Sequence, residues 1–371
     1  MAGNFVQLHN HTHYSLLDGA SKVPDLVKRV KELGMPAVGI TDHGNMHGAY
    51  ELWRAAVDSG VKPIIGIEAY VTPETARQDK TRVSWDTNWT PVPGHVRNPD
   101  DVSGGGLITH LTMWAENDEG LVNLIKASSV ANLEGRVMRY PRMDKEVLST
   151  YSKGVIASSG CPSGIIQTRL RLGQFDEALR AAGEFQDIFG KDNFYIELMD
   201  HGLSIESKVT GDLLTIAKKL GAPLLATNDS HYVMEADKDA QDAMLCINSG
   251  ATLDDPNRFK FEGSGYYIKS AEEMRELFKD HPDACDNTLE IAERCNVIFD
   301  DHEDGAFMPQ FDCPEGWDET SLFLKKVEEG LEKRYDGNPP MEVLKQADYE
   351  CGVICQMQFC GYFLVVADYI N

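Results

Sequence analysis

The sequence predicts an α/β protein in which helices cover parallel strands. Two observations support this fold class: short apolar segments rich in β-branched residues alternate with amphipathic stretches, and the short segments are apolar on both faces. The candidate strands are residues 5–10, 36–41, 63–70, 107–115, 154–159, 194–200 and 223–228. A closed β/α barrel and an open, doubly wound sheet both satisfy this alternation, so the pattern leaves the choice between them open.

The helices between the strands are predicted from apolar periodicity. In residues 21–34 the apolar side chains recur on one helical face, and Gly34 suits the C-terminal cap. Similar patterns predict helices over residues 46–59, 116–132, 175–189 and 205–220.

Residues 73–106 interrupt the alternation. This stretch has many Pro, Asp and Gly residues and no apolar periodicity. We expect a long, mobile surface loop in which His95 is solvated.

Further elements are predicted after the seventh strand. They are a helix over 235–248, a possible hairpin over 258–270, a helix over 271–295, a linker over 300–315 and a mainly helical segment from Asp318 onward. The final apolar run, residues 359–371, stops without a polar tail, and we expect the natural chain to continue beyond it.

Composition limits the possible functions. The chain has 371 residues and a formal charge of −24, which would repel a phosphate backbone. A stand-alone nucleic-acid binder is therefore disfavoured, unless bound divalent cations reverse the local field or the DNA-binding surface lies outside this chain. Scattered cysteines suggest free thiols, and the absence of a signal sequence or of an apolar run of about 18 residues suggests a cytosolic protein with no membrane partner.

Metal-binding residue types gather at the predicted strand ends, where parallel β/α folds place their sites. From the first strand to the seventh they are His9 and His11, Asp42 and His43, Glu68, His110, Cys161, Asp200 and His201, and Asp229 and His231. His9 and His11 flank one residue, so both imidazoles lie on one face of the strand and can reach one ion. Neutral imidazole, carboxylate and thiolate together favour zinc, iron or manganese over calcium.

Two of these residues allow alternative interpretations. Cys161 precedes Pro162, a favoured first helical residue, so its thiol could face a helix N-terminus that stabilises the thiolate. The alternative for Cys161 is a small buried hydrophobic residue. His201 fits a substrate contact and a structural role equally well.

Taken together, these motifs point to a family. HxH at 9–11, Asp18, TDHG at 41–44, Glu68, His110, GCPSG around Cys161 and NDSHY at 228–232 resemble the polymerase and histidinol phosphatase (PHP) domain. The whole chain resembles the N-terminal part of bacterial DNA polymerase III alpha subunits, with YSLLDGA, KPIIGIEAYV, NTLEIAERCNV and GYFLVVADYIN in family order.

The resemblance implies a fold, a domain organisation and a set of ligands. The fold would be a distorted seven-stranded (β/α)7 barrel over residues 1–295, followed over 296–371 by a linker and the truncated, mainly helical start of the polymerase palm region. Active family members carry three metals, here zinc, manganese or iron. The implied sites are His9, His11, Glu68 and Asp229; Glu68, His110 and Cys161, with Glu68 bridging; and Asp18, His43 and His231.

The resemblance also implies an activity. A complete ligand set is typical of family members whose domain is a 3′–5′ exonuclease, with a metal-activated water in place of a protein nucleophile. The expected partners are the 3′ end of DNA, other polymerase domains and replisome subunits such as the sliding clamp. The family's polymerase aspartates lie beyond residue 371, so we expect no DNA synthesis by this chain. The rival hypotheses are a metal-stabilised structural module and a small-molecule phosphatase.

Overall fold

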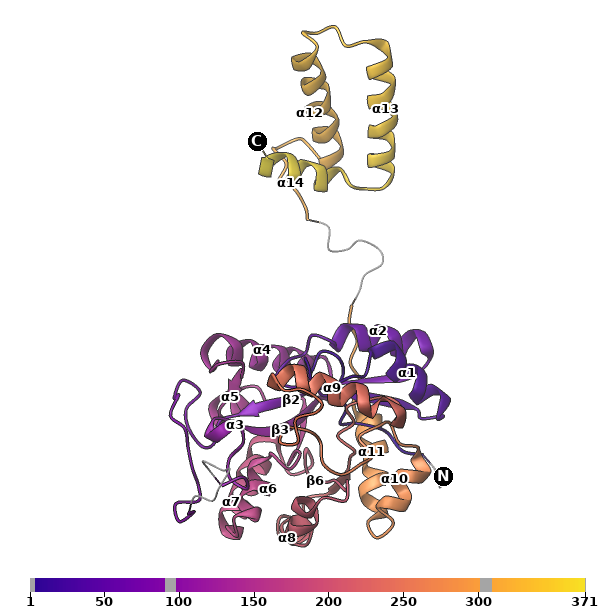
Figure 1. Cartoon of the computed structure of the whole chain (residues 1–371). Coiled ribbons are helices and arrows are strands. Elements are labelled where there is room, and N and C mark those ends of the chain that lie inside the picture. Colours follow the sequence, from indigo (N-terminus) through magenta and orange to yellow (C-terminus); the bar gives the residue numbers. More distant parts are fainter. Residues whose placement is uncertain (1–3, 91–97, 301–308, 371) are drawn as a thin grey trace. The chain divides into compact units, whose positions relative to one another are not determined.

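A computed structural model of the chain describes residues 4–90, 98–300 and 309–370. Contacts divide the chain into two compact units, Met1–Phe299 and Asp300–Asn371 (Figure 1). His95 lies outside the described residues.

The first unit is built on a mixed sheet. Its strands are β1 (Ala37–Ile40), β2 (Lys62–Val71), β3 (Thr109–Ala115), β4 (Arg142–Met143), β5 (Val155–Ser158), β6 (Phe194–Leu198) and β7 (Leu224–Ala226). The order is β1-β2-β3-β5-β6-β7, and the short β4 pairs with β2 outside this path.

The segment predicted as the first strand joins the two ends of this sheet. The Gly39 N–H donates to the carbonyl of Gln7 at 2.8 Å, while the His11 N–H donates to the carbonyl of Ser230 at 2.8 Å. The segment makes isolated bridges to each neighbour and no continuous ladder. It still lies between β1 and the residues that follow β7, so the sheet closes into the expected distorted barrel with seven strand positions.

The prediction that all strands run parallel is wrong for β3. This strand is antiparallel to both β2 and β5, and His110 is the partner of Tyr70. In the described part of residues 73–106 the only helix is the short α3 (Ser103–Gly106), so no long helix carries the chain to the opposite end of the barrel. β3 therefore begins at the end of the barrel where β2 finishes, which places His110 there.

The barrel interior is filled by side chains from every strand position. This cluster contains Val6, Leu8, Ala37, Ile64, Trp114, Ile156, Tyr195 and Leu225, with Ile291, Ala292 and Cys295 from α11 and the residue after it. Position 66 in β2 is a glycine, because a Cβ at this position would lie 2.4 Å from the Met113 carbonyl oxygen. Polar residues occupy the end of the barrel at which β2 finishes.

Helices surround the barrel, and one of them, α11, also contributes side chains to its interior. They are α1 (Val23–Glu32), α2 (Ala49–Ser59), α4 (Asp118–Glu134), α5 (Lys145–Thr150), α6 (Ile165–Arg171), α7 (Phe175–Phe189), α8 (Ser204–Leu220), α9 (Lys238–Ser249), α10 (Ala271–Leu277) and α11 (Pro282–Arg294). Two predictions need correction. The helix over 271–295 is two helices, since Pro282 starts a new one, and residues 258–270 contain no hairpin but a single bridge from Tyr267 to Tyr232.

The described flanks of the predicted loop are fastened to the barrel. The fully buried Arg142 donates to the carbonyls of Arg77 and Asp79, both at 2.7 Å. The Asp101 carboxylate accepts the Trp85 N–H at 3.1 Å. The mobility expected of the loop as a whole stays a prediction.

The second unit is helical, as expected. It contains α12 (Glu319–Arg334), α13 (Met341–Gln356) and α14 (Cys360–Ile370), packed around Leu322, Phe323, Cys360 and Leu364. Among the described residues no single helix is long and apolar enough to cross a membrane. The pair α13 and α14 meets the length and composition criteria only jointly, across a bend of 114°.

Candidate metal centre

All nine residues predicted as ligands meet at the polar end of the barrel. Glu68, at 0% exposure, lies at the middle of the group. Its carboxylate oxygens lie 3.5 Å from His9 Nε2, 3.6 Å from His11 Nε2, 2.6 Å from His43 Nδ1 and 3.2 Å from His110 Nδ1. The single carboxylate of β2 thus contacts four imidazoles from three other parts of the chain.

Asp229 contributes the second carboxylate beside the HxH pair. Its Oδ1 lies 3.4 Å from His9 Nε2 and 3.1 Å from His11 Nε2. Asp229 has a positive φ of 44°, a conformation that Asp tolerates better than most residues and that often occurs at functional sites.

His110 and Cys161 lie at another side of Glu68. The Cys161 Sγ is 3.3 Å from His110 Nδ1. The expected helix N-terminus does not begin at Pro162, because α6 starts at Ile165. Burial, followed by the charges of Glu68 and Asp229, raises the pKa of the Cys161 thiol well above its usual value, so without a metal this thiol is protonated.

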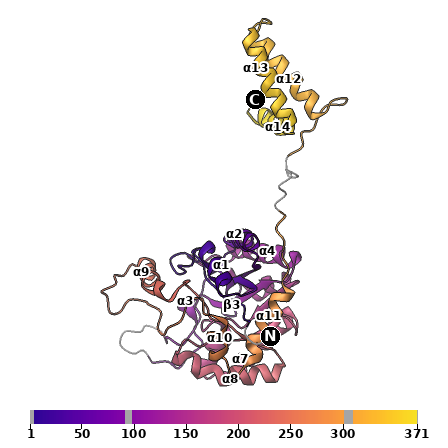
Figure 2. The same cartoon turned by 90° about the vertical axis from the view of Figure 1, so that its right-hand side faces the viewer.

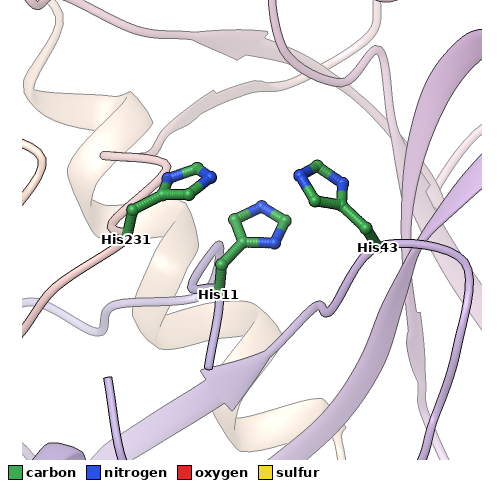
Figure 3. A group of neighbouring side chains, drawn as sticks. All are labelled: His11, His43 and His231. Carbon is green, nitrogen blue, oxygen red and sulfur yellow. The ribbon is translucent and has the colours of Figure 1, made fainter. Parts of the chain in front are cut away.

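Asp18, His43 and His231 form the third group. Asp18 Oδ2 lies 2.8 Å from His43 Nε2 and 3.5 Å from His231 Nε2. The ring of His11 lies between the other two imidazoles (Figure 3), with centroids 4.1 Å from His43 and 4.3 Å from His231.

Three sets of side chains have donor atoms that all lie within 4.8 Å of one another. They are His11, His43 and His231; His9, His11 and Asp229; and His43, Glu68 and His110. These sets overlap with the three sites implied by the resemblance but divide the histidines differently. The assignment of each residue to one particular ion therefore stays a prediction.

The donor atoms fit metal ions because they are buried without other partners. Within the described chain, seven such atoms lack a hydrogen-bond partner: His9 Nε2, His11 Nε2, His43 Nδ1, both carboxylate oxygens of Glu68, Asp229 Oδ1 and His231 Nε2. His43 Nδ1 and Glu68 approach to 2.6 Å without the geometry of a hydrogen bond. A buried polar atom left unpaired costs about 1–3 kcal/mol, so an arrangement of seven is stable when a further positive charge satisfies them.

The surroundings shift the pKa values of His11 and His9 in opposite directions. Burial, with the charges of His43 and His231, lowers the pKa of His11 to about 3. The imidazole of His11 is therefore neutral, the form in which histidine binds metals. Burial also acts to lower the pKa of His9, but the charges of Glu197 and Asp229 outweigh it and raise that pKa well above its usual value.

Glu197, which is not among the residues predicted from the sequence, contacts the candidate ligand His9. It lies in β6 at 1% exposure, and one carboxylate oxygen accepts a hydrogen bond from His9 Nδ1 at 2.7 Å. The same carboxylate accepts from the hydroxyls of Ser158 and Thr227, both at 2.5 Å. A carboxylate that orients a ligating histidine in this way is a common feature of metal sites. The available signal was a lone acidic residue inside the apolar strand FYIEL.

Asp42 organises the loop that carries Asp18. Its buried carboxylate accepts the N–H of Thr12 at 2.7 Å and the hydroxyl of Ser15 at 2.7 Å. The Asp42 carboxylate binds Thr12 and Ser15 and belongs to none of the three sets of donor atoms, which fits a positioning role.

His201 has no nitrogen free for a substrate. Its Nδ1 lies 2.7 Å from Glu206, and its Nε2 donates to the carbonyl of Asn228 at 2.8 Å. The ring also stacks on Tyr266 at 4.0 Å. Of the two roles left open for His201, these contacts favour the structural one.

The ligand side chains differ in access to solvent. Those of His9, His11 and Glu68 are 0% exposed, whereas those of Asp18, His43, Asp229 and His110 are 18%, 16%, 14% and 12% exposed. A substrate would therefore approach from the side on which these four partly exposed residues lie.

Fold and site together define a distorted β/α barrel that gathers metal-ligand residue types at one end. The PHP domain family matches residues 7–201, more than half of the sequence, and the chain belongs to this family. Residues 321–371 match the bacterial DNA polymerase III alpha NTPase domain.

Curated relatives specify the relationship further. The DNA polymerase III alpha subunits of Mycobacterium leprae and Mycobacterium tuberculosis (strain H37Rv) are each 50% identical to this chain over 369 residues, 99% of its length. That of Borreliella burgdorferi is 40% identical over 371 residues, again 99% of the chain. The chain spans 30–31% of the length of these relatives.

Among solved structures, an amidohydrolase from Chromobacterium violaceum matches this chain with 14% sequence identity and a TM-score of 0.35. The match covers 61% of this chain and 87% of the amidohydrolase. This similarity is too distant to inform on the site.

Proposed function

We propose that this chain hydrolyses phosphodiester bonds at the 3′ end of DNA with bound divalent metals. It would act as the 3′–5′ exonuclease of a replicative DNA polymerase alpha subunit in the cytoplasm, proofreading newly made DNA. The observation that carries the proposal is the convergence of nine donor side chains with seven buried, unpaired donor atoms. A site built only for structure has no need of the partly exposed pair Asp18 and His43.

The proposed ligands follow the three groups. His9, His11, Glu68 and Asp229 would hold the first ion, Glu68, His110 and Cys161 the second, and Asp18, His43 and His231 the third, with zinc, manganese or iron as candidates. When bound, such ions lower the pKa of a water to about 7 and stabilise the charge on a phosphate, so no protein nucleophile is required.

The chain's own residues would prepare this site. Glu197 fixes the orientation of the His9 ring through Nδ1. Asp42 holds the Thr12 to Ser15 turn, and thereby the start of the loop that presents Asp18. The lowered pKa of His11 keeps its imidazole neutral at physiological pH.

The second candidate function is a metal-stabilised scaffold for other polymerase parts. It is favoured by the complete burial of His9, His11 and Glu68, since structural metal sites are closed to solvent. A small-molecule phosphatase is the weakest candidate, because residues 321–371 match a polymerase domain.

The proposal includes a domain organisation and partners. Residues 1–295 would form the PHP domain, and residues 296–371 would form a linker and the start of the palm. We propose the sliding clamp and other replisome subunits as partners.

A nuclease assay beside metal analysis tests the proposal. The purified chain is incubated with a primer labelled at its 5′ end, so that removal of 3′ nucleotides gives a ladder of shortened products, and its zinc, manganese and iron are measured by mass spectrometry. We expect close to three metal equivalents and shortening from the 3′ end. Three equivalents without any cleavage would support the scaffold, and less than one equivalent that added manganese or zinc does not restore would overturn both functions.

A further inference from the structure

A cavity of about 420 Å³ lies beside the metal centre. Its walls come from Tyr232, from α9 and from the segment between Arg258 and Tyr266. Figure 2 shows α9 and the chain that follows it standing out at one side of the barrel. The volume falls within the range of about 300–1,000 Å³ that is usual for pockets binding small organic groups.

The cavity shares its walls with two candidate ligands. The ring of Phe261 packs edge-on against His231, with centroids 4.6 Å apart. On α9, Gln241 donates from Nε2 to the backbone carbonyl of Asp18 at 3.2 Å. A molecule in the cavity would therefore lie next to the accessible side of the metal centre.

Aromatic rings lead outward from this shared wall. Phe261 contacts Tyr266 at 4.8 Å and Phe259 at 6.2 Å between centroids. Phe259 is 62% exposed, so one end of this series is open to solvent. Exposed aromatic rings in series are the feature on which the bases of a single nucleic-acid strand stack.

The charged side chains that line the cavity have a small net positive charge, in a strongly acidic chain. Lys238, Arg258 and Lys260 line it, against the carboxylates of Asp242 and Glu262. Arg258 pairs with Asp242 at 2.5 Å. In the described part of the chain Lys238 and Lys260 have no ion pair, so two cations stay available in a protein with a net charge of −24.

We propose that this cavity is the subsite for the 3′-terminal nucleotides of single-stranded DNA. A base stacks on Phe259 or Phe261, and the backbone phosphates lie near Lys260 and Lys238. The inference rests on the proposed function, because the metal centre beside the cavity is where such an end would be cleaved. It adds the residues that would hold the strand.

Binding tests the subsite independently of catalysis. The probe is a 5′-fluorescein oligothymidine whose 3′-terminal linkages are phosphorothioates, which resist cleavage, and its affinity for the manganese-loaded chain is measured by anisotropy. Phe259→Ala is expected to weaken binding about five- to hundredfold, as the loss of one stacked base does. Lys260→Glu should also weaken binding of the oligonucleotide, by a larger factor at low salt than at high salt. Tyr349→Ala, which removes another exposed ring, and Lys218→Glu, which makes the same charge change on α8, are the controls.

Cleavage separates failure of the subsite from failure of the proposed function. On a normal 3′ end Phe259→Ala should raise KM with little change in kcat, and on an end with abasic terminal nucleotides the parent and Phe259→Ala should have equal KM. Unchanged binding and KM in Phe259→Ala and Lys260→Glu would overturn the subsite while leaving the exonuclease in place. Binding that depends on Phe259 and Lys260 in a chain without nuclease activity would support the subsite and contradict the exonuclease.

Discussion

The carboxylate of Glu197 accepts a hydrogen bond from Nδ1 of His9 at 2.7 Å, and both side chains are fully enclosed by the barrel. Once a metal displaces one of the two protons of His9, this contact keeps the other proton on Nδ1 and leaves the lone pair on Nε2. Nε2 is the atom that faces Glu68 and Asp229. A strand residue without a motif of its own thus leaves Nε2 as the nitrogen of His9 that faces the other candidate ligands.

Glu197→Gln is expected to weaken metal binding by about 10- to 100-fold, because partners that orient metal-ligating histidines typically contribute this much. The amide keeps the size of the side chain but no longer accepts from all three of His9, Ser158 and Thr227. Competition with a coloured chelator measures the affinity. Glu290→Gln, on the surface of α11, is the control, and equal affinity in both variants would show that Glu197 does not position His9.

Asp18→Asn and His43→Ala should each lower nuclease activity at least about 10- to 100-fold while the barrel stays folded. Both side chains lie at the accessible side of the metal centre, and neither belongs to the apolar clusters. Steady-state cleavage of a labelled primer measures the loss, and circular dichroism checks the fold. Asp25→Asn, an exposed residue of α1, is the matched control. Equal activity in the parent and Asp18→Asn would attribute the cleavage to a contaminant or another site.

Much of the fold could be predicted because the spacing at which apolar residues recur indicates which faces of a strand or helix are buried. The seven strand positions follow from apolar segments that are buried on both faces, and the helix over residues 175–189 has the predicted bounds. Periodicity contains no information on direction, however. The antiparallel course of β3 follows from a connection whose described residues contain no long helix, and this connection is what brings His110 to the site.

The site was predictable to the extent that its residues follow strand ends. The nine candidates come together, since closure of the sheet brings the strand ends to one place. Glu197 lies inside a strand and belongs to no motif, so its only signal in the sequence was that of a lone acidic residue in the apolar segment FYIEL. The partners of His201, Glu206 and the Asn228 carbonyl, come from separate elements, so sequence spacing could not reveal them.

Removal of the metals is expected to destabilise the protein more at high pH than at low pH. Burial acts to lower the pKa of His9 and of His43 in the metal-free site, but neighbouring groups outweigh it and raise both well above their usual value. A raised pKa in the folded state contributes stability that is full below the unfolded value of about 6.5 and is lost as the pH rises through the folded value. Metals replace these protons, so their binding tightens as the pH rises.

The measurement is the melting temperature of the metal-loaded and the chelator-treated chain at about pH 6 and about pH 8.5, on either side of the ordinary histidine pKa. The difference between the two forms should be larger at the higher pH. A difference that is equal at both values, or larger at low pH, would contradict displacement of protons from His9 and His43 by the metals.

Arg142→Met is expected to destabilise the first unit by about 3 kcal/mol without loss of metal. The buried guanidinium donates to four backbone carbonyls, those of Gly135, Leu107, Arg77 and Asp79. Methionine fills much of the same space but donates no hydrogen bond, so these carbonyls lose their charged donor. Arg142→Lys should recover only part of the loss, because an ammonium cannot reproduce the planar fork of the guanidinium.

Thermal unfolding and limited proteolysis measure this effect. The melting temperature of Arg142→Met should fall by roughly 5–10 °C, and cleavage within residues 73–90 should accelerate, since Arg77 and Asp79 lose their anchor. The exposed Arg136→Met removes the same charge from the same connection and serves as the control. If the two variants melt and are cleaved alike, Arg142 does not hold this segment against the barrel. Retention of metal in Arg142→Met, with faster cleavage at residues 73–90, would show that the segment is fastened independently of the metal centre.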